Sequence, residues 1–211
     1  MVITYHGAAF VKIVFGETTI AVNPIGKSSK EKGARFGADI ALVSLRHEDF
    51  NGIDQVAHGD REPFVIDGPG EYEVKKVFIR GFPSVSLYGG EERINTMYLV
   101  TLEGMNLCFL GALSSRKLPA AFQEAVENVD VLFVPIGGAG TLKAAEAHEL
   151  SVELEAGIVI PLLYNVEGAQ KGSLQKFLGE ENAKNEKFLE KLTLKKKDVE
   201  EKTGEIVVLK E

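Results

Sequence analysis

A histidine and an aspartate two residues apart are the first side chains of this sequence that could carry out chemistry. His47 and Asp49 lie in a polar segment directly after the apolar run 40–45. An imidazole and a carboxylate at this spacing can share a proton or supply two ligands to a metal ion. The simpler interpretation, which we favour from the residues alone, is a solvent-facing pair or a histidine held by a local hydrogen bond. His58 and His148 have no companions at ligand spacing, so we expect them on the surface.

A glycine-rich segment, 135–141, is a second place where a ligand could bind. It connects a predicted strand to a predicted helix, and free backbone N–H groups at a helix start can hold an anion. Gly138 and Thr141 are the candidate residues. The segment is neither a Walker nor a dinucleotide-binding motif, so a tight structural turn is the favoured interpretation.

Other catalytic motifs are missing from the sequence. It contains no Gly-x-Ser-x-Gly elbow, no His-Glu-x-x-His pair and no paired-cysteine zinc motif. A Ser-His-Asp triad stays open, because its members are neighbours in space and need not be close in sequence.

The elements that position these residues follow from the spacing of apolar and turn residues. A hairpin is predicted at 10–15 and 18–22, and a run that is apolar throughout predicts a strand buried on both faces at 40–45. Further strands are predicted at 64–66, 71–74, 77–80, 96–102, 106–110, 131–135, 158–163 and 206–209. Helical spacing predicts helices at 118–128, 142–154 and 174–189, the last with a break at Gly179.

Composition indicates one soluble domain spanning residues 1–211. The chain is 45% hydrophobic and carries a net charge of −7, with a pI near 5.3. No broad cationic surface is available for a nucleic-acid backbone. The lysine run 195–197 is offset by Asp198, Glu200 and Glu201, so we expect a solvated surface there.

The single cysteine and the start of the chain bear on location. Cys108 lies in an apolar run, which predicts a buried strand thiol and fits a reducing cytoplasm. The first residues lack the basic start and apolar stretch of a signal peptide, and no later segment approaches the ~20 apolar residues that span a bilayer. We therefore expect a cytoplasmic protein without a membrane partner.

Six segments resemble, in order, the landmarks of the metallo-β-lactamase superfamily, in its branch of small lactonase-like "zinc-dependent hydrolases". They are Ile3-Thr4-Tyr5-His6-Gly7-Ala8-Ala9-Phe10, Thr19-Ile20-Ala21-Val22-Asn23-Pro24, 38–50, Asp67-Gly68-Pro69-Gly70-Glu71-Tyr72-Glu73-Val74, 129–138 and 158–164. The resemblance covers most of residues 1–164 with compatible spacing. It implies an α/β fold, a four-layer αββα sandwich, with a dinuclear metal site whose bound hydroxide attacks an ester, lactone, amide or phosphodiester.

The resemblance also places the family's metal ligands on this sequence. The two spaced histidines of the signature fall on Leu45 and His47, its aspartate on Asp49 and its last histidine on Phe50. The later ligands fall on Ser86, Ala112 and Leu163, and the family's early histidine falls on Ala8, two residues after His6.

Only His47 and Asp49 could still bind a metal, and in the family pattern they serve different ions. Catalytic zinc needs about three protein ligands. The sequence therefore predicts no bound metal and no cofactor, with apolar side chains filling the former site.

Three functional hypotheses follow. The first is a catalytically silent module that binds an unidentified small ligand or protein partner, with His47, Asp49, Ser86, Gly138 and Thr141 as its candidate contacts. The alternative is a hydrolase with an ester, lactone or phosphoester substrate, which uses one weakly held metal at His47 and Asp49 or a metal-independent mechanism. A third is assembly as a homo-oligomer or with an active relative. Metal analysis would separate the first two, and light scattering would test the third.

Overall fold

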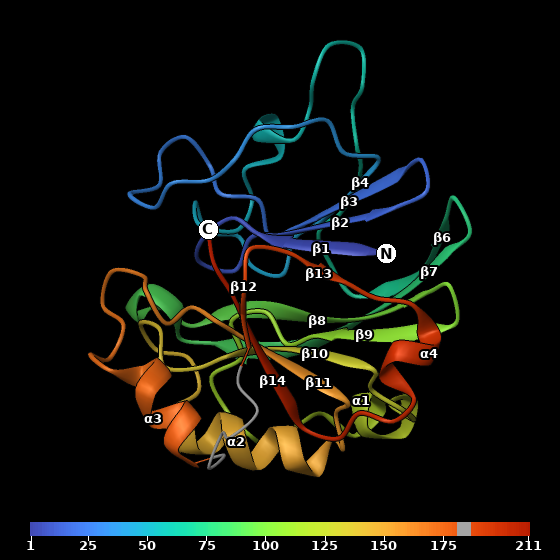
Figure 1. The fold of residues 1–211 in the computed structure, drawn as a ribbon. Helices are drawn as coiled ribbons and strands as arrows, with labels where there is room; N and C mark the ends of the chain where they lie inside the picture. The colour runs from blue at the N-terminus through green and yellow to red at the C-terminus, as the bar shows by residue number, and fades with distance from the viewer. Residues whose placement is uncertain (181–186) are drawn as a thin grey trace.

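Two β-sheets pack face to face, and helices cover the outer side of one of them (Figure 1). The computed structural model describes residues 1–180 and 187–211. The first sheet has the strand order β13-β1-β2-β3-β4-β5. Its strands are β1 (Val2–Tyr5), β2 (Val11–Phe15), β3 (Thr18–Val22), β4 (Ile40–Leu42), β5 (Phe64–Ile66) and β13 (Leu192–Thr193).

The predicted hairpin and buried strand are both present in the first sheet. Strands β2 and β3 pair antiparallel across the turn at Gly16, whose φ of +55° suits glycine. Strand β4 ends at Leu42 and not at residue 45. The N–H of Val43 still donates to Ile66 of β5, but the carbonyl of Ser44 already accepts the N–H of Thr96 in the second sheet. This crossing carries the chain into the loop that holds His47.

The second sheet has the order β12-β14-β11-β10-β9-β8-β7-β6. Its strands are β6 (Gly70–Val74), β7 (Val77–Ser86), β8 (Arg93–Leu102), β9 (Met105–Phe109), β10 (Val131–Pro135), β11 (Ile158–Leu162), β12 (Lys187–Leu189) and β14 (Glu205–Leu209). Strands β7 and β8 run well beyond the predicted 77–80 and 96–102. Their pairing continues through Pro83 to Ser86↔Arg93, so cross-strand partners extend both strands past the local turn signals.

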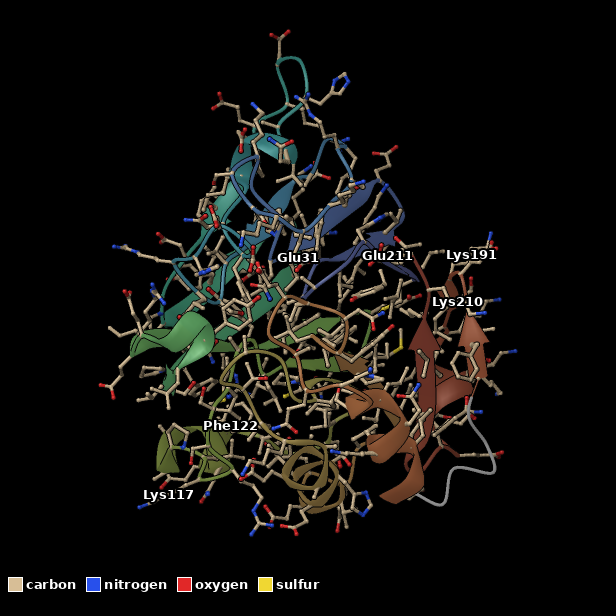
Figure 2. The ribbon with its side chains drawn as sticks, turned by 90° about the vertical axis from the view of Figure 1, so that its left-hand side faces the viewer. Glu31, Lys117, Phe122, Lys191, Lys210 and Glu211 are labelled. Atoms are coloured by element: carbon tan, nitrogen blue, oxygen red, sulfur yellow. The ribbon has the colours of Figure 1, made fainter. Side chains whose placement is uncertain are left out.

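Helices lie on the outer side of the second sheet. They are α1 (Ala120–Ala125), α2 (Ala144–Glu153) and α3 (Ser173–Glu180), with a short α4 (Lys196–Val199) at the sheet edge. Figure 2 shows Phe122 in this helical layer, where its ring packs edge-on against Phe82 at 5.4 Å. On the outer face of the first sheet, the described segments are loops and the 3₁₀ turn η1 (Ile53–Gln55).

The helix predicted over 174–189 is correct only in its first part. Residues 174–180 belong to α3, residues 181–186 lie outside the described part, and 187–189 form strand β12. Strand β12 pairs parallel with β14, in the register Lys187↔Val207. Residues 187–189 therefore form a strand despite their helical spacing, because they pair with a strand about 20 residues further along the chain.

The lysine run, predicted as a solvated surface, is exposed at Lys195 and Lys197 and partly exposed at Lys196, which also makes an ion pair. The ammonium of Lys196 lies 2.9 Å from the carboxylate of Asp130, whose side chain is 10% exposed. This ion pair fixes α4 against the start of β10.

The core fills the space between the sheets and beneath the helices. Cys108 lies in β9 without solvent exposure, as predicted, and burial raises the pKa of its thiol. Among the described residues, no helix combines the length and the apolar character required to cross a bilayer.

Candidate functional site

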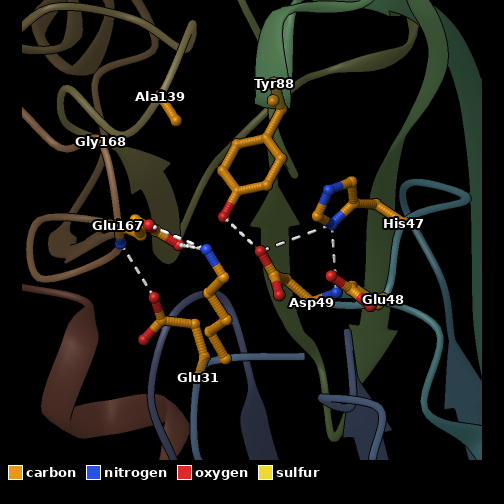
Figure 3. A pocket seen from close by; sticks show the side chains of 10 residues that line it. Glu31, His47, Glu48, Asp49, Tyr88, Ala139, Glu167 and Gly168 are labelled. Atoms are coloured by element: carbon orange, nitrogen blue, oxygen red, sulfur yellow. Dashed lines mark hydrogen bonds and ion pairs between the residues drawn. The ribbon is translucent and has the colours of Figure 1, made fainter. Parts of the chain in front are cut away.

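A cleft of about 320 Å³ opens where loops from both sheets meet (Figure 3). Figure 2 labels Glu31, one of the residues that line this cleft. The loop after β4 supplies His47, Glu48 and Asp49, and the 3₁₀ turn η2 (Tyr88–Gly90) follows β7. The remaining lining residues come from the loops after β3, β10 and β11, and they are Lys30, Glu31, Ala139, Glu167 and Gly168.

His47 and Asp49 are in direct contact at the base of the cleft. The Nδ1 atom of His47 accepts a hydrogen bond from the backbone N–H of Asp49 at 3.2 Å and lies 3.4 Å from its Oδ2. The local hydrogen bond considered from the sequence is therefore present. Asp49 is buried, with 8% exposure, and does not face solvent as the simplest interpretation supposed.

Tyr88 completes a hydrogen-bonded chain with these two residues. Its hydroxyl donates to Oδ2 of Asp49 at 2.7 Å, and its ring meets the His47 ring edge-on at 5.0 Å. Ser29 donates to the other carboxylate oxygen of Asp49. Burial and the adjacent Asp49 carboxylate raise the pKa of Tyr88, so the phenol stays protonated and keeps donating.

An ion pair and a backbone hydrogen bond connect the two sides of the cleft mouth. The ammonium of Lys30 lies 2.8 Å from Glu167, and the N–H of Glu167 donates to Glu31 at 2.9 Å. The hydrogen bond to Glu167 raises the pKa of Lys30. The lining holds one lysine against four carboxylates, Glu31, Glu48, Asp49 and Glu167, a formal balance of −3 with histidine neutral.

Most of the other positions that hold metal ligands in the family are buried in the hydrophobic core of this protein. Leu45, Phe50, Ala112 and Leu163 are each at most 1% exposed and belong to one hydrophobic cluster, which also contains Tyr88. Ser86 is fully buried beside them, where its hydroxyl accepts the N–H of Tyr88 at 3.1 Å. These side chains lie behind the cleft and do not line it.

Gly138 and Thr141 lie next to the cleft, but only their neighbour Ala139 lines it. The N–H of Thr141 donates to Gly138, and that of Leu142 donates to Leu113. The N–H of Lys143 donates to the carboxylate of Glu146. Protein acceptors take these three N–H groups, whereas the buried hydroxyl of Thr141 has no hydrogen-bond partner among the described residues, so the anion-binding hypothesis stays a prediction.

The remaining histidines lie away from the cleft lining. His6 is half-buried, packs against Phe10 and Phe36 and makes a 3.2 Å contact with Thr4. Burial lowers the pKa of His6. His58 is exposed in a loop, as predicted, whereas His148 is partly buried on α2.

The side chains present do not fit the family's zinc centre. The described residues contain no group of three or more His, Cys, Asp or Glu side chains placed to hold one ion. A catalytic zinc requires about three such ligands, and hydrocarbon occupies most of the corresponding positions.

Sequence reasoning missed Tyr88, Gly89 and the residues of the cleft mouth. A signal was available for two of them, since Tyr88-Gly89-Gly90 begins two residues after the ligand position at Ser86. Lys30 and Glu31 are more than 130 residues away from Glu167, and no local pattern links the two segments.

Comparison with known proteins agrees with this fold. The sequence model of the β-lactamase superfamily domain matches residues 2–163. A UPF0173 metal-dependent hydrolase from Listeria innocua is 26% identical over 199 residues, covering 78% of this chain and 86% of the relative.

Solved structures show the same architecture. A candidate Zn-dependent hydrolase of the metallo-β-lactamase superfamily from Thermotoga maritima superposes with a TM-score of 0.76 at 28% identity, covering 99% of this chain and 97% of the other. A metal-dependent hydrolase candidate from Parabacteroides distasonis has a TM-score of 0.64 at 16% identity over 85% and 88% of the two chains. The second likeness concerns the fold alone.

These relatives correct the first functional hypothesis. A catalytically silent binding module was expected, yet the similar proteins are named as metal-dependent hydrolases. That expectation is wrong, and the hydrolase alternative is the better supported. The expectation of no metal is likewise unsupported, because the relatives' names include metal dependence.

Proposed function

Because this chain belongs to the metallo-β-lactamase superfamily, we propose that it is a hydrolase with a remodelled metal site, acting on a carboxylic ester or lactone. The observation that carries the proposal is the chain of contacts from Tyr88 through Asp49 to His47 at the base of the cleft. The names of its relatives support the reaction class.

The charge of the cleft favours an uncharged substrate. Four carboxylates outnumber the single ammonium of Lys30 in the lining. A phosphodiester would bring its own negative charge into this field, and like charges repel. We therefore favour an ester or lactone over a phosphoester.

The proposed reaction uses His47 as the base. Its Nε2 lies near Gly89 at the cleft wall, and a Cβ added at Gly89 would lie 3.3 Å from it. A water molecule there would lose a proton to Nε2 while its oxygen attacks the carbonyl carbon. When the C–O bond of the ester breaks, the imidazolium returns this proton to the leaving alkoxide, which gives an acid and an alcohol.

Asp49 would support either neutral tautomer of His47. When Nδ1 carries the lone pair, it accepts the N–H of Asp49 at 3.2 Å. When Nε2 carries the lone pair and acts as the base, the proton is on Nδ1 and faces Oδ2 of Asp49 at 3.4 Å. The hydroxyls of Ser29 and Tyr88 hold that carboxylate in place.

We predict that His47→Gln lowers kcat on an activated ester by ~10²- to 10⁴-fold, the usual contribution of a positioned base. The assay would compare p-nitrophenyl acetate, γ-butyrolactone and bis(p-nitrophenyl) phosphate. His58→Gln is the matched control, because this exposed histidine lies outside the cleft. Full activity in His47→Gln would remove His47 from the mechanism. The absence of hydrolysis of every substrate in the wild-type protein would contradict the proposed function.

Location and partners stay predictions. A cytoplasmic environment suits the buried thiol of Cys108, and the net charge of −7 disfavours nucleic acid.

A further inference from the structure

We propose that Tyr88 and the apolar side chains around it replace the family's metal centre, so that hydrolysis in this cleft proceeds without a bound metal. The inference rests on the proposed function, and it names what has taken the metal's place.

The first argument is the chemistry of the ligand positions. Leu45, Phe50, Ala112 and Leu163 offer only carbon atoms, and all four are buried in one cluster. Hydrocarbon cannot coordinate a cation, and its packing there stabilises the fold by excluding water. Occupying this space with an ion would therefore require the core to open.

The second argument concerns the two ligand positions that keep polar side chains able to bind metal. Both oxygens of Asp49 already accept hydroxyl hydrogen bonds, from Ser29 and Tyr88. The Nδ1 of His47 accepts the N–H of Asp49. A metal bound at Nδ1 would displace this donor, because Nδ1 has a single lone pair, and a metal bound at Asp49 would compete with two hydroxyl donors for its oxygens.

The third argument is the position of the Tyr88 ring, which lies between the two halves of the signature loop. It packs edge-on against His47 at 5.0 Å and against Phe50 at 5.1 Å. Tyr88 is only 3% exposed. Its hydroxyl supplies the Asp49 carboxylate with a donor, which is the electrostatic role that a cation plays beside this aspartate in the family.

Arg93 holds this tyrosine in place through the backbone. Its Nη1 donates to the carbonyl of Tyr88 at 3.0 Å. The buried hydroxyl of Ser86 accepts the N–H of the same residue. Tyr88 is therefore fixed at its backbone, its ring and its hydroxyl.

The test begins with metal content and thermal stability, which do not depend on activity. Protein purified without chelator would be analysed for zinc, manganese and iron, and its Tm measured with EDTA and with added Zn²⁺. A metal whose free concentration is 100 times its Kd stabilises the folded state by ~2.7 kcal/mol. For a chain of this size, that would raise Tm by roughly 5–10 °C. We expect substoichiometric metal and a Tm that neither EDTA nor Zn²⁺ moves.

The second part of the test is a pair of tyrosine variants. Tyr88→Phe removes the donor to Asp49 and should lower kcat on p-nitrophenyl acetate by about tenfold, because a tenfold change corresponds to ~1.4 kcal/mol, within the range of one hydrogen bond to a charged group. Tyr72→Phe is the control, since its hydroxyl makes long 3.3 Å contacts with the carbonyls of Gly68 and Pro69, just before β6 and outside the cleft lining. Wild-type activity should be unchanged by EDTA.

The outcomes separate the inference from the proposed function. Stoichiometric metal whose removal lowers Tm and abolishes hydrolysis would overturn the inference and leave the hydrolase assignment intact. A metal-free, EDTA-insensitive protein that hydrolyses no ester or lactone would instead contradict the proposed function. Equal activity in Tyr88→Phe and Tyr72→Phe would remove Tyr88 from its assigned role.

Discussion

The imidazole of His47 meets Asp49 at one nitrogen and faces Gly89 with the other. Each contact depends on the backbone as much as on the side chain. The loop after β4 presents both the N–H and the carboxylate of Asp49 to Nδ1, and the positive φ of +72° at Gly89 turns η2 past Nε2. The smallest residue at this position leaves room for a substrate beside the base.

We predict that Gly89→Ala reduces kcat by about tenfold or more, because small displacements beside reacting atoms are costly. The new Cβ would lie 3.3 Å from Nε2 of His47. Gly90→Ala is the matched control. Its φ is also positive, at +85°, but nothing lies within 4 Å of an added Cβ. Both variants should lose roughly 1–2 kcal/mol of stability to backbone strain, so a selective loss of activity reports the contact with His47. Equal losses of kcat would contradict this explanation.

At the scale of elements, Asp39 connects segments of both sheets at the start of β4. Its carboxylate accepts the N–H of Thr19 at the start of β3, an ammonium hydrogen bond from Lys75 in the β6–β7 turn and a guanidinium hydrogen bond from Arg61. Burial alone would raise the pKa of Asp39, but these hydrogen bonds outweigh it and lower the pKa to about 2.

This lowered pKa predicts how acid affects stability. The folded-state pKa lies below the unfolded value, so Asp39 stabilises the protein above pH ~4, and this stabilisation is lost as the pH falls from ~4 towards 2. Since Lys75 and Arg61 are about half exposed, solvent screening reduces the contribution to about 1 kcal/mol. Asp39→Asn should therefore lower the free energy of unfolding at pH 7 and have little effect near pH 2.

Urea unfolding at both pH values would measure this difference. Asp60→Asn is the control, because Asp60 is exposed in the loop before β5. A destabilisation by Asp39→Asn that is as large at pH 2 as at pH 7 would show that the charge is not its source.

At the scale of the whole molecule, the two sheets are joined by buried polar contacts as well as by the core. The hydroxyl of Tyr98, on β8, lies 2.8 Å from the carbonyl of Val43, directly after β4, and 3.0 Å from that of Ile66, at the end of β5. These carbonyls flank the crossing that leads to His47. Burial raises the pKa of Tyr98, which keeps its hydroxyl protonated as a donor.

We predict that Tyr98→Phe lowers the free energy of unfolding by about 1–3 kcal/mol, the cost of leaving buried acceptors unpaired. Chemical denaturation would measure it, with Tyr72→Phe as a partly exposed control. If the crossing positions His47, hydrolysis should also fall. An unchanged free energy of unfolding would remove this contact from the forces that hold the sheets together.

The sequence by itself determined the family, the two-sheet α/β architecture and most of the strands, because alternating and continuous apolar runs follow local rules. It also identified His47 and Asp49 through their spacing. Only the tertiary structure decided that 187–189 form a strand, that β4 stops at Leu42 and that Tyr88 joins Asp49. Each of these depends on a partner more than 15 residues away, and a pairing between distant segments leaves no periodic signal in either of them. The first functional hypothesis was overturned by the names of the relatives and not by the fold, and a list of lost ligands could not show which side chains the fold brings into their place.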